Sequence, residues 1–216
     1  MPQNQPEGYL AIPRSGKGPG VLVLHAWWGL NQTMRTVCQR LAEQGYVAFA
    51  PDLYHGKVVA TIEEAEGMVQ ELNKKSEQAE ADVGAAVDFL MEQTGLEHDR
   101  IAVVGFSLGA AYALDLSITD PERVSTVVVF YGTGGGDFSR SQATYLAHFA
   151  ENDPFEPEES VTWLEQALEE AGRPATIYRY PETGHWFFEP DREDAFNQPA
   201  AALAWERTLA FLKGSL

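Results

Sequence analysis

The chain has 216 residues, of which 44% are hydrophobic, and this is enough for one domain with a substantial core. Its formal net charge is -17, from 32 acidic and 15 basic side chains, which disfavours binding to nucleic-acid phosphates or to anionic lipid surfaces. We therefore expect a single domain over residues 1–216, with no nucleic-acid and no membrane partner.

Cysteine usage and the first residues indicate a cellular compartment. Cys38 is the only cysteine, so an internal disulfide and a metal cage of cysteines are excluded. The opening MPQNQPEGYL has neither a basic region nor an apolar region of the kind found in secretory signals, and no apolar run approaches the roughly 20 residues that span a bilayer. These features predict a cytoplasmic protein.

Apolar runs bounded by turn residues predict buried strands, and stretches with helical period separate them. Strand and helix alternate, which predicts a mostly parallel twisted sheet with helices on both faces and functional loops at the carboxyl ends of the strands. After a short edge strand in GYLAI, the expected strands are Gly20–His25, Tyr46–Ala50, Ile101–Gly105, Val124–Tyr131, Ala143–Ala150 and Ala175–Tyr180; the expected helices are Thr33–Gln44, Ile62–Gln93 with a break near Lys74–Ser76, Leu108–Ile118, Glu158–Ala171 and Pro199–Lys213.

The stretch VVGFSLGAA around Ser107 has the pattern of a sharp strand-to-helix turn that exposes a serine nucleophile. Gly105 and Gly109 are small because larger side chains would collide in such a turn. A serine hydroxyl needs a base to take its proton and an acid to orient that base, in the chain order serine, acid, histidine.

Five histidines compete for the role of base. His185 follows the strand Ala175–Tyr180 in a loop that reaches the carboxyl edge of the sheet, and it is the candidate base. His148 lies within a predicted strand and is expected in the core, whereas His55 and His98 lie in polar turns. His25 ends a strand but precedes the serine, against the expected order.

Asp153 is the candidate acid, because it follows the strand Ala143–Ala150, one crossover before the strand that leads to His185. Asp137 emerges one strand too early, and Glu151 is expected to point elsewhere. An oxyanion needs two donors, for which we predict the backbone N–H groups of Leu108 and Trp27. The aromatic side chains that we expect to line the substrate pocket are Trp28, Tyr54, Trp186 and Phe187.

The chain resembles the dienelactone hydrolase family of α/β-hydrolases over nearly its whole length. The separations of 46 positions from Ser107 to Asp153 and of 32 from Asp153 to His185 are similar to those of the family. The resemblance implies an α/β-hydrolase fold and a Ser-His-Asp triad. The motifs that carry it are YVAF, APDLY, GFSLGA, FYG, ENDPF and GHWFF, in family order.

Three positions depart from the namesake of the family. Its nucleophile is a cysteine, where this chain has Ser107, and Cys38 lies within a predicted helix as an apolar filler. Its glutamate near the thiol aligns with Ala26, and a pocket arginine aligns with Glu189. Arg192, three positions after Glu189, is an arginine that could take over the binding of a substrate carboxylate, so the charge of the substrate stays open.

These observations predict a serine hydrolase that cleaves a small ester or lactone through an acyl-enzyme on Ser107. The chain has no nucleotide-binding or metal-binding motif, so we expect no cofactor and no metal. A peptidase or a thioesterase on the same scaffold, or a non-catalytic protein that binds a ligand, are the alternatives. The sequence leaves the oligomeric state open.

Overall fold

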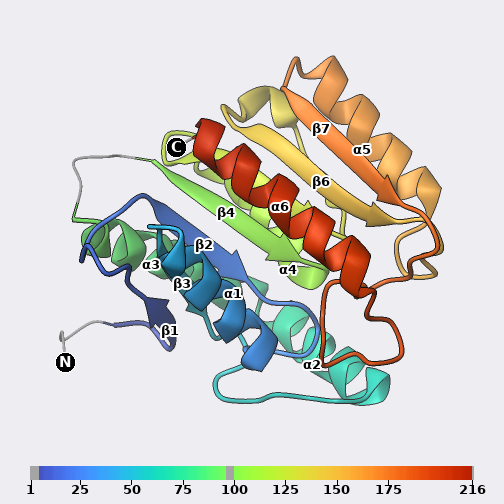
Figure 1. Cartoon of the computed structure of the whole chain (residues 1–216), viewed down its shortest axis with the longest axis horizontal. Helices are drawn as coiled ribbons and strands as arrows, with labels where there is room; N and C mark the ends of the chain where they lie inside the picture. The colour runs from blue at the N-terminus through green and yellow to red at the C-terminus, as the bar shows by residue number, and fades with distance from the viewer. Residues whose placement is uncertain (1–4, 96–99, 216) are drawn as a thin grey trace. The chain divides into compact units, whose positions relative to one another are not determined.

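The structure is a computed structural model that describes residues 5–95 and 100–215, and His98 therefore lies outside the described residues. The chain forms two compact units, residues 1–101 and 102–216 (Figure 1). A single domain over the whole chain stays a prediction.

The first unit contains a small sheet in the order β1-β3-β2. Its strands are β1 (Gly8–Ala11), β2 (Gly20–Leu24) and β3 (Val47–Pro51). β2 runs parallel to β3, whereas β1 is antiparallel to β3 and forms the edge that the sequence predicted. Every residue of β2 and β3 is buried, as expected for continuous apolar strands that are covered on both faces.

Three helices accompany these strands: α1 (Gln32–Glu43), α2 (Ile62–Lys74) and α3 (Ser76–Gln93). α1 packs against all three strands, α3 packs against β2 and β3, and α2 packs against α3. The side chain of Asn31 caps α1, and Thr61 and Glu64 form a capping box at the start of α2. The predicted break in the long helical stretch is confirmed at Lys75.

The second unit contains four strands in sequential order: β4 (Ile101–Phe106), β5 (Val124–Phe130), β6 (Thr144–Ala150) and β7 (Ala175–Tyr180). β5, β6 and β7 pair in parallel, as the alternation of strand and helix predicted. β4 is buried throughout, whereas β7 is partly exposed because it lies at the edge.

The helices of the second unit are α4 (Leu108–Thr119), α5 (Glu158–Glu170) and α6 (Gln198–Ser215). α4 packs against β5, α6 packs against β5 and β6, and α5 packs against β7 (Figure 1). A short 3₁₀-helix, Phe138–Arg140, was not predicted; the Asp137 side chain accepts a hydrogen bond from the Ser139 N–H and begins this turn. Within residues 5–95 and 100–215, no helix has both the length and the apolar composition of a membrane span.

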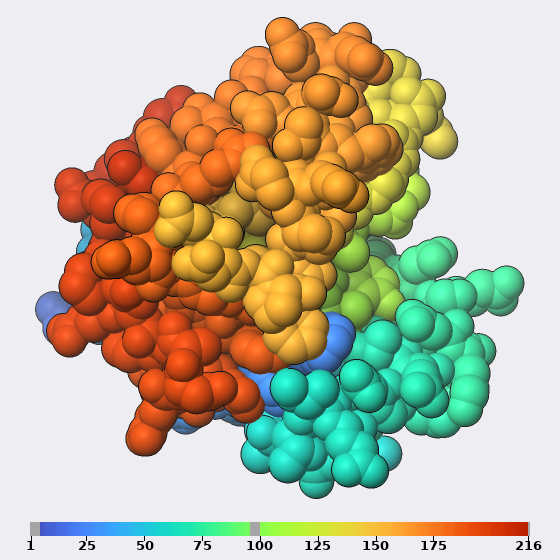
Figure 2. Space-filling view, turned by 90° about the vertical axis from the view of Figure 1, so that its right-hand side faces the viewer, coloured from blue at the N-terminus to red at the C-terminus, as the bar shows by residue number. Residues whose placement is uncertain are grey.

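Parallel strands bring their carboxyl ends, and the loops that follow, to one edge. The segments after β6 and after β7 lie side by side on the face seen in Figure 2, in yellow-orange and in orange to red. Two backbone hydrogen bonds join them: the Glu151 N–H donates to the Tyr180 carbonyl (3.1 Å) and the Asn152 N–H donates to the Thr183 carbonyl (2.9 Å). These bonds hold the loop of Asp153 next to the loop of His185.

Candidate active site

Ser107 lies at a strained turn between β4 and α4, with φ 49° and ψ -112°. Its N–H donates to the Phe130 carbonyl (2.9 Å), which ties the turn to the end of β5. A Cβ atom at Gly105 would lie 2.3 Å from the Gly109 carbonyl oxygen, and one at Gly132 would lie 2.5 Å from that of Ser107. The close approach confirms that Gly105 must be small, and positive φ at a serine is typical of a nucleophile elbow.

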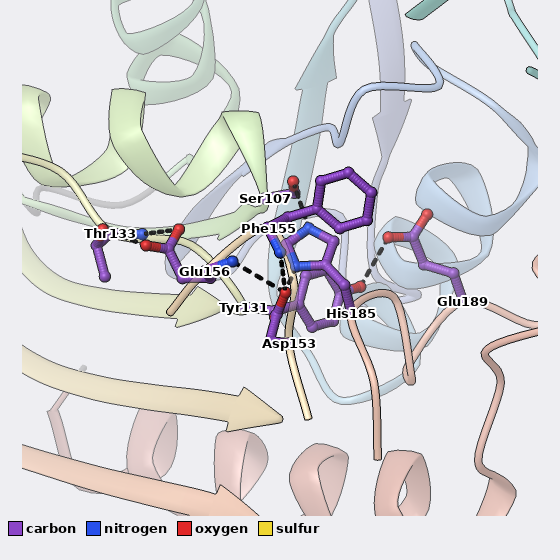
Figure 3. A network of polar contacts seen from close by, with 8 residues as sticks. All are labelled: Ser107, Tyr131, Thr133, Asp153, Phe155, Glu156, His185 and Glu189. Carbon is purple, nitrogen blue, oxygen red and sulfur yellow. Dashed lines mark hydrogen bonds and ion pairs between the residues drawn. The ribbon is translucent and has the colours of Figure 1, made fainter. Parts of the chain in front are cut away.

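Three side chains from separate loops form one hydrogen-bonded chain (Figure 3). Ser107 Oγ lies 2.8 Å from His185 Nε2, and His185 Nδ1 lies 2.7 Å from Asp153 Oδ2. The His185 and Asp153 side chains are 5% and 2% exposed. A proton on Nδ1, held by the carboxylate, leaves the Nε2 lone pair free to accept the Ser107 proton. The arrangement can therefore generate a serine nucleophile.

The second oxygen of Asp153 is fixed by its own loop. Asp153 Oδ1 accepts hydrogen bonds from the N–H groups of Phe155 (2.9 Å) and Glu156 (3.0 Å). The Glu156 carboxylate in turn accepts from Thr133, at 3.0 Å from its N–H and 2.6 Å from its hydroxyl (Figure 3). Thr133 follows β5, so this contact joins two neighbouring loops. Thr133 and Glu156 were not predicted from the sequence, because no spacing pattern marks such a pair.

Tyr131 and Glu189 form a buried pair behind His185. The Tyr131 hydroxyl donates to Glu189 Oε1 at 2.7 Å, and the Tyr131 ring lies 5.0 Å from the imidazole ring of His185. Both side chains are fully buried. In the sequence, Glu189 was noted only as the position of an absent arginine. The signal for this buried pair was a carboxylate beside the aromatic run of GHWFFEP.

The environment of Glu189 favours its neutral form. Burial raises the pKa of this carboxyl to about 8, and the negative charge of Asp191 acts in the same direction, whereas the Tyr131 hydroxyl and Arg192 oppose the shift. Burial also raises the pKa of Tyr131 well above its ordinary value. Glu189 is therefore mostly protonated at neutral pH.

We expect the stability of Glu189→Gln, relative to that of the wild type, to increase as the pH rises. The folded chain keeps a proton that the unfolded chain releases, so the wild type loses stability as the pH rises from about 4.5 to about 8. Glutamine keeps the acceptor for the Tyr131 hydroxyl without a charge. In urea unfolding at pH 5 and at pH 8, the free energy of unfolding of the variant should gain about 3 kcal/mol on that of the wild type between the two pH values. A constant difference would show that Glu189 does not titrate in this range.

The other described histidines take part in local structure. His148 is buried, as predicted, between the Tyr180 hydroxyl (2.8 Å) and the Thr208 hydroxyl (3.1 Å), and burial lowers its pKa to about 3. His25 is buried and accepts from the Leu53 N–H (3.3 Å), and burial lowers its pKa. His55 lies exposed in a turn, as predicted.

Cys38, Asp137 and Glu151 take part in local contacts of their own elements. Cys38 is buried within α1, as predicted, and burial raises its thiol pKa to about 12, which makes it a poor nucleophile. Asp137 caps the short 3₁₀-helix, and Glu151 accepts from the Glu182 N–H (2.9 Å).

Of the predicted pocket aromatics of the second unit, Trp186 packs against His185 and Phe187 packs against Tyr131. The Trp186 ring contacts the His185 ring (4.7 Å), and the Arg192 guanidinium lies over its indole (5.1 Å). Arg192 also pairs with Asp194 at 3.2 Å. Phe187 is fully buried against the Tyr131 ring. Pocket roles for Trp186 and Phe187 stay predictions.

Phe155 is an aromatic neighbour of His185 that the sequence analysis missed. Its ring lies 5.3 Å from the imidazole and 4.9 Å from the Trp186 indole, while the side chain is 40% exposed. Of the two predicted oxyanion donors, Leu108 is the first residue of α4, where N–H groups have no acceptor within the helix, and Trp27 is half-buried in the loop after β2. The predicted pocket residues Trp28 and Tyr54 are buried in the first unit.

Among the described residues, no group of three or more His, Cys, Asp or Glu side chains is arranged to hold a metal ion.

The sequence model of the dienelactone hydrolase family matches residues 7–216. The chain belongs to the dienelactone hydrolase family. "Protein usf" of Aquifex pyrophilus is 30% identical over 95% of this chain and 92% of its own length. "Putative carboxymethylenebutenolidase" of Aquifex aeolicus is 29% identical over the same shares.

A solved structure confirms the predicted fold class. The crystal structure of "Putative Dienelactone Hydrolase" from Klebsiella pneumoniae is 27% identical to this chain. It superposes with a TM-score of 0.82 over 94% of this chain and 90% of that one. The fold is that of the α/β-hydrolases, and the family is one of hydrolases.

Proposed function

We propose that this family member is a serine hydrolase that cleaves a small ester or lactone through an acyl-enzyme on Ser107. The observation that carries the proposal is the hydrogen-bonded chain from Ser107 through His185 to Asp153, with its serine at a strained elbow. A serine with positive φ is costly to hold, and such strain is retained where it presents a nucleophile. The dienelactone hydrolase family, to which the chain belongs, also supports a hydrolase.

In the first half of the reaction His185 acts as a general base. Its Nε2 takes the proton of the Ser107 hydroxyl as Oγ attacks the carbonyl carbon of the substrate, and Asp153 stabilises the imidazolium that forms. The tetrahedral intermediate then collapses, and the imidazolium donates its proton to the leaving alkoxide. An ester on Ser107 and a free alcohol result; with a lactone, the alcohol stays attached to the acyl group.

In the second half a water molecule replaces the alcohol. His185 takes a proton from this water, which attacks the acyl carbon, and the imidazolium returns that proton to Ser107 Oγ as the acid leaves. The N–H of Leu108, at the N-terminus of α4, is the proposed first donor to the oxyanion. From its place in the loop after β2 we propose the N–H of Trp27 as the second donor.

The proposed substrate class rests on the chemistry of the serine and on the relatives. A serine that is activated by a histidine attacks the carbonyl carbons of esters and lactones readily. The name of the A. aeolicus relative, "Putative carboxymethylenebutenolidase", supports a lactone. The only cysteine, Cys38, is buried and its thiol pKa is raised, which supports Ser107 over a thiol.

Covalent labelling tests the proposal. Incubation with a fluorophosphonate at pH 7.5, followed by peptide mapping, should place one label per chain on Ser107, because an activated serine attacks the phosphorus and displaces fluoride. Denatured protein is the control and should remain unlabelled. Native protein that remains unlabelled would favour the alternative of a non-catalytic ligand-binding protein, and labelling without turnover of p-nitrophenyl acetate would favour a peptidase or a thioesterase.

A further inference from the structure

Glu189 has an unpartnered oxygen in a fully buried site. Its Oε1 accepts from the Tyr131 hydroxyl, but its Oε2 has no hydrogen-bond partner among the described residues. Buried carboxylates are normally paired, because an ion removed from water without donors costs much free energy. The site therefore suits a neutral carboxylic acid, in agreement with its raised pKa of about 8.

The partner of Glu189 is itself held in a strained conformation beside His185. Tyr131 has φ 36°, in the left-handed region that bulky residues avoid, and its N–H donates to the His148 carbonyl at 2.8 Å. Trp186, directly after His185, has φ 63°. Two strained aromatic residues thus adjoin the imidazole, and the bond to Glu189 is the polar anchor of the Tyr131 side chain.

We propose that protonated Glu189 is a positioning residue for His185, acting through the Tyr131 ring, and that its ionisation lowers the reactivity of Ser107. This inference rests on the proposed function, since it assigns His185 as the base. Under this proposal, the loss of one proton from Glu189, which contacts no reacting atom, changes the geometry of the catalytic residues. Figure 3 shows the hydrogen bond between Tyr131 and Glu189.

The backbone between His185 and Glu189 transmits the effect. Consecutive turns join the segment: the Phe187 N–H donates to the Gly184 carbonyl (3.3 Å) and the Glu189 N–H donates to the Trp186 carbonyl (2.9 Å). An ionised Glu189 gains hydration only by moving out of its buried site. Such a movement displaces the turn that carries His185 and withdraws the anchor of the Tyr131 ring.

The charged groups around Tyr131 and Glu189 do not offset the effect of burial on the Glu189 carboxyl. Asp191, from the same loop, disfavours ionisation of Glu189, and Arg192 favours it but also pairs with Asp194. From the loop after β6, the charge of Asp153 acts on Tyr131. Burial outweighs the favourable effect of Arg192, because it is the largest influence on Glu189.

The test is the rate of fluorophosphonate labelling of Ser107 in the intact protein, measured from pH 6.5 to 9.5 in the wild type and in Glu189→Gln. We expect the wild-type rate constant to fall at least threefold between pH 7.5 and 9.5. The variant, normalised to its own rate at pH 7.5, should change by less than 1.5-fold. A purely structural role would change the rate equally at every pH.

Two further variants sharpen the comparison. Glu193→Gln removes an exposed carboxylate from the same loop and should keep the wild-type decline. Tyr131→Phe keeps the ring against His185 but removes the hydroxyl. The hydrogen bond from this hydroxyl favours ionisation of Glu189, so the decline of the labelling rate should move to higher pH in the variant. Circular dichroism at each pH checks that every variant is folded.

The outcomes separate this inference from the proposed function. An equal decline in the wild type and in Glu189→Gln, or no decline in the wild type, would overturn the role of Glu189. If Glu189→Gln does not fold, a Tyr131→Phe decline at the wild-type pH would overturn it instead. Labelling with the expected pH profiles, but without ester turnover, would reject the ester substrate and retain the role of Glu189. Folded proteins that never label would overturn both.

Discussion

Replacing Ser107 with alanine is expected to lower kcat/KM for p-nitrophenyl acetate by at least about a thousandfold. The reason is the loss of the Ser107 hydroxyl oxygen, which lies 2.8 Å from His185 Nε2. Residual hydrolysis should remain, since donors to the oxyanion are still present. The measurement is steady-state kinetics at pH 7.5, with circular dichroism to show that the variant is folded.

Ser139→Ala provides a matched control for this prediction. Ser139 is exposed in the short 3₁₀-helix and bonds to Asp137, so its loss should change kcat/KM by less than twofold. Activity of Ser107→Ala within about tenfold of the wild type would contradict the assignment of Ser107 as the nucleophile.

Asp153→Asn is expected to lower kcat/KM by about a hundredfold or more, with little loss of folded structure. The amide can present an N–H to His185 Nδ1, where the carboxylate accepts one at 2.7 Å. The imidazole would then carry its proton on Nε2 and could not accept one from Ser107. The measurement is again kcat/KM at pH 7.5, together with a thermal midpoint to show that stability is retained.

Asp137→Asn is the matched control, because Asp137 lies in the loop after β5, between Ser107 and His185 in the chain. It caps a 3₁₀-helix and should be nearly neutral for activity. If Asp153→Asn retains activity while Asp137→Asn loses it, then Asp137 is the acid, and the geometry of the His185–Asp153 pair has no catalytic meaning.

The alternation of elements could be predicted because each strand and helix carries its own pattern of burial. β7 was predicted with its observed bounds, and the other strands with bounds within a few residues. The break between α2 and α3 near Lys75 was also predictable. The elbow at Ser107 could be recognised for a related reason: the need for a small residue at Gly105 arises within five positions, from the Gly109 backbone.

The chain order of parallel strands was enough to select Asp153 and His185 as candidates, because their loops follow neighbouring strands. The sequence could not supply the distances, which depend on the paths of two loops. Those paths are held by bonds such as that from the Asn152 N–H to the Thr183 carbonyl. The sequence pattern also could not predict which of the proposed pocket aromatics are buried, since an apolar side chain suits a core and a pocket alike.

By itself, the sequence determined the class of fold, the strained turn at Ser107 and the loops that carry an acid and a histidine. Only the tertiary structure decided which polar side chains meet behind them. Tyr131 and Glu189 are 58 positions apart, and Thr133 and Glu156 are 23 apart. Local periodicity indicates which face of its own helix or strand is buried. These contacts instead arise from the register of β5 with β6 and β7 and from the loops beyond their ends. A buried carboxyl with one partner is visible only once that register is known.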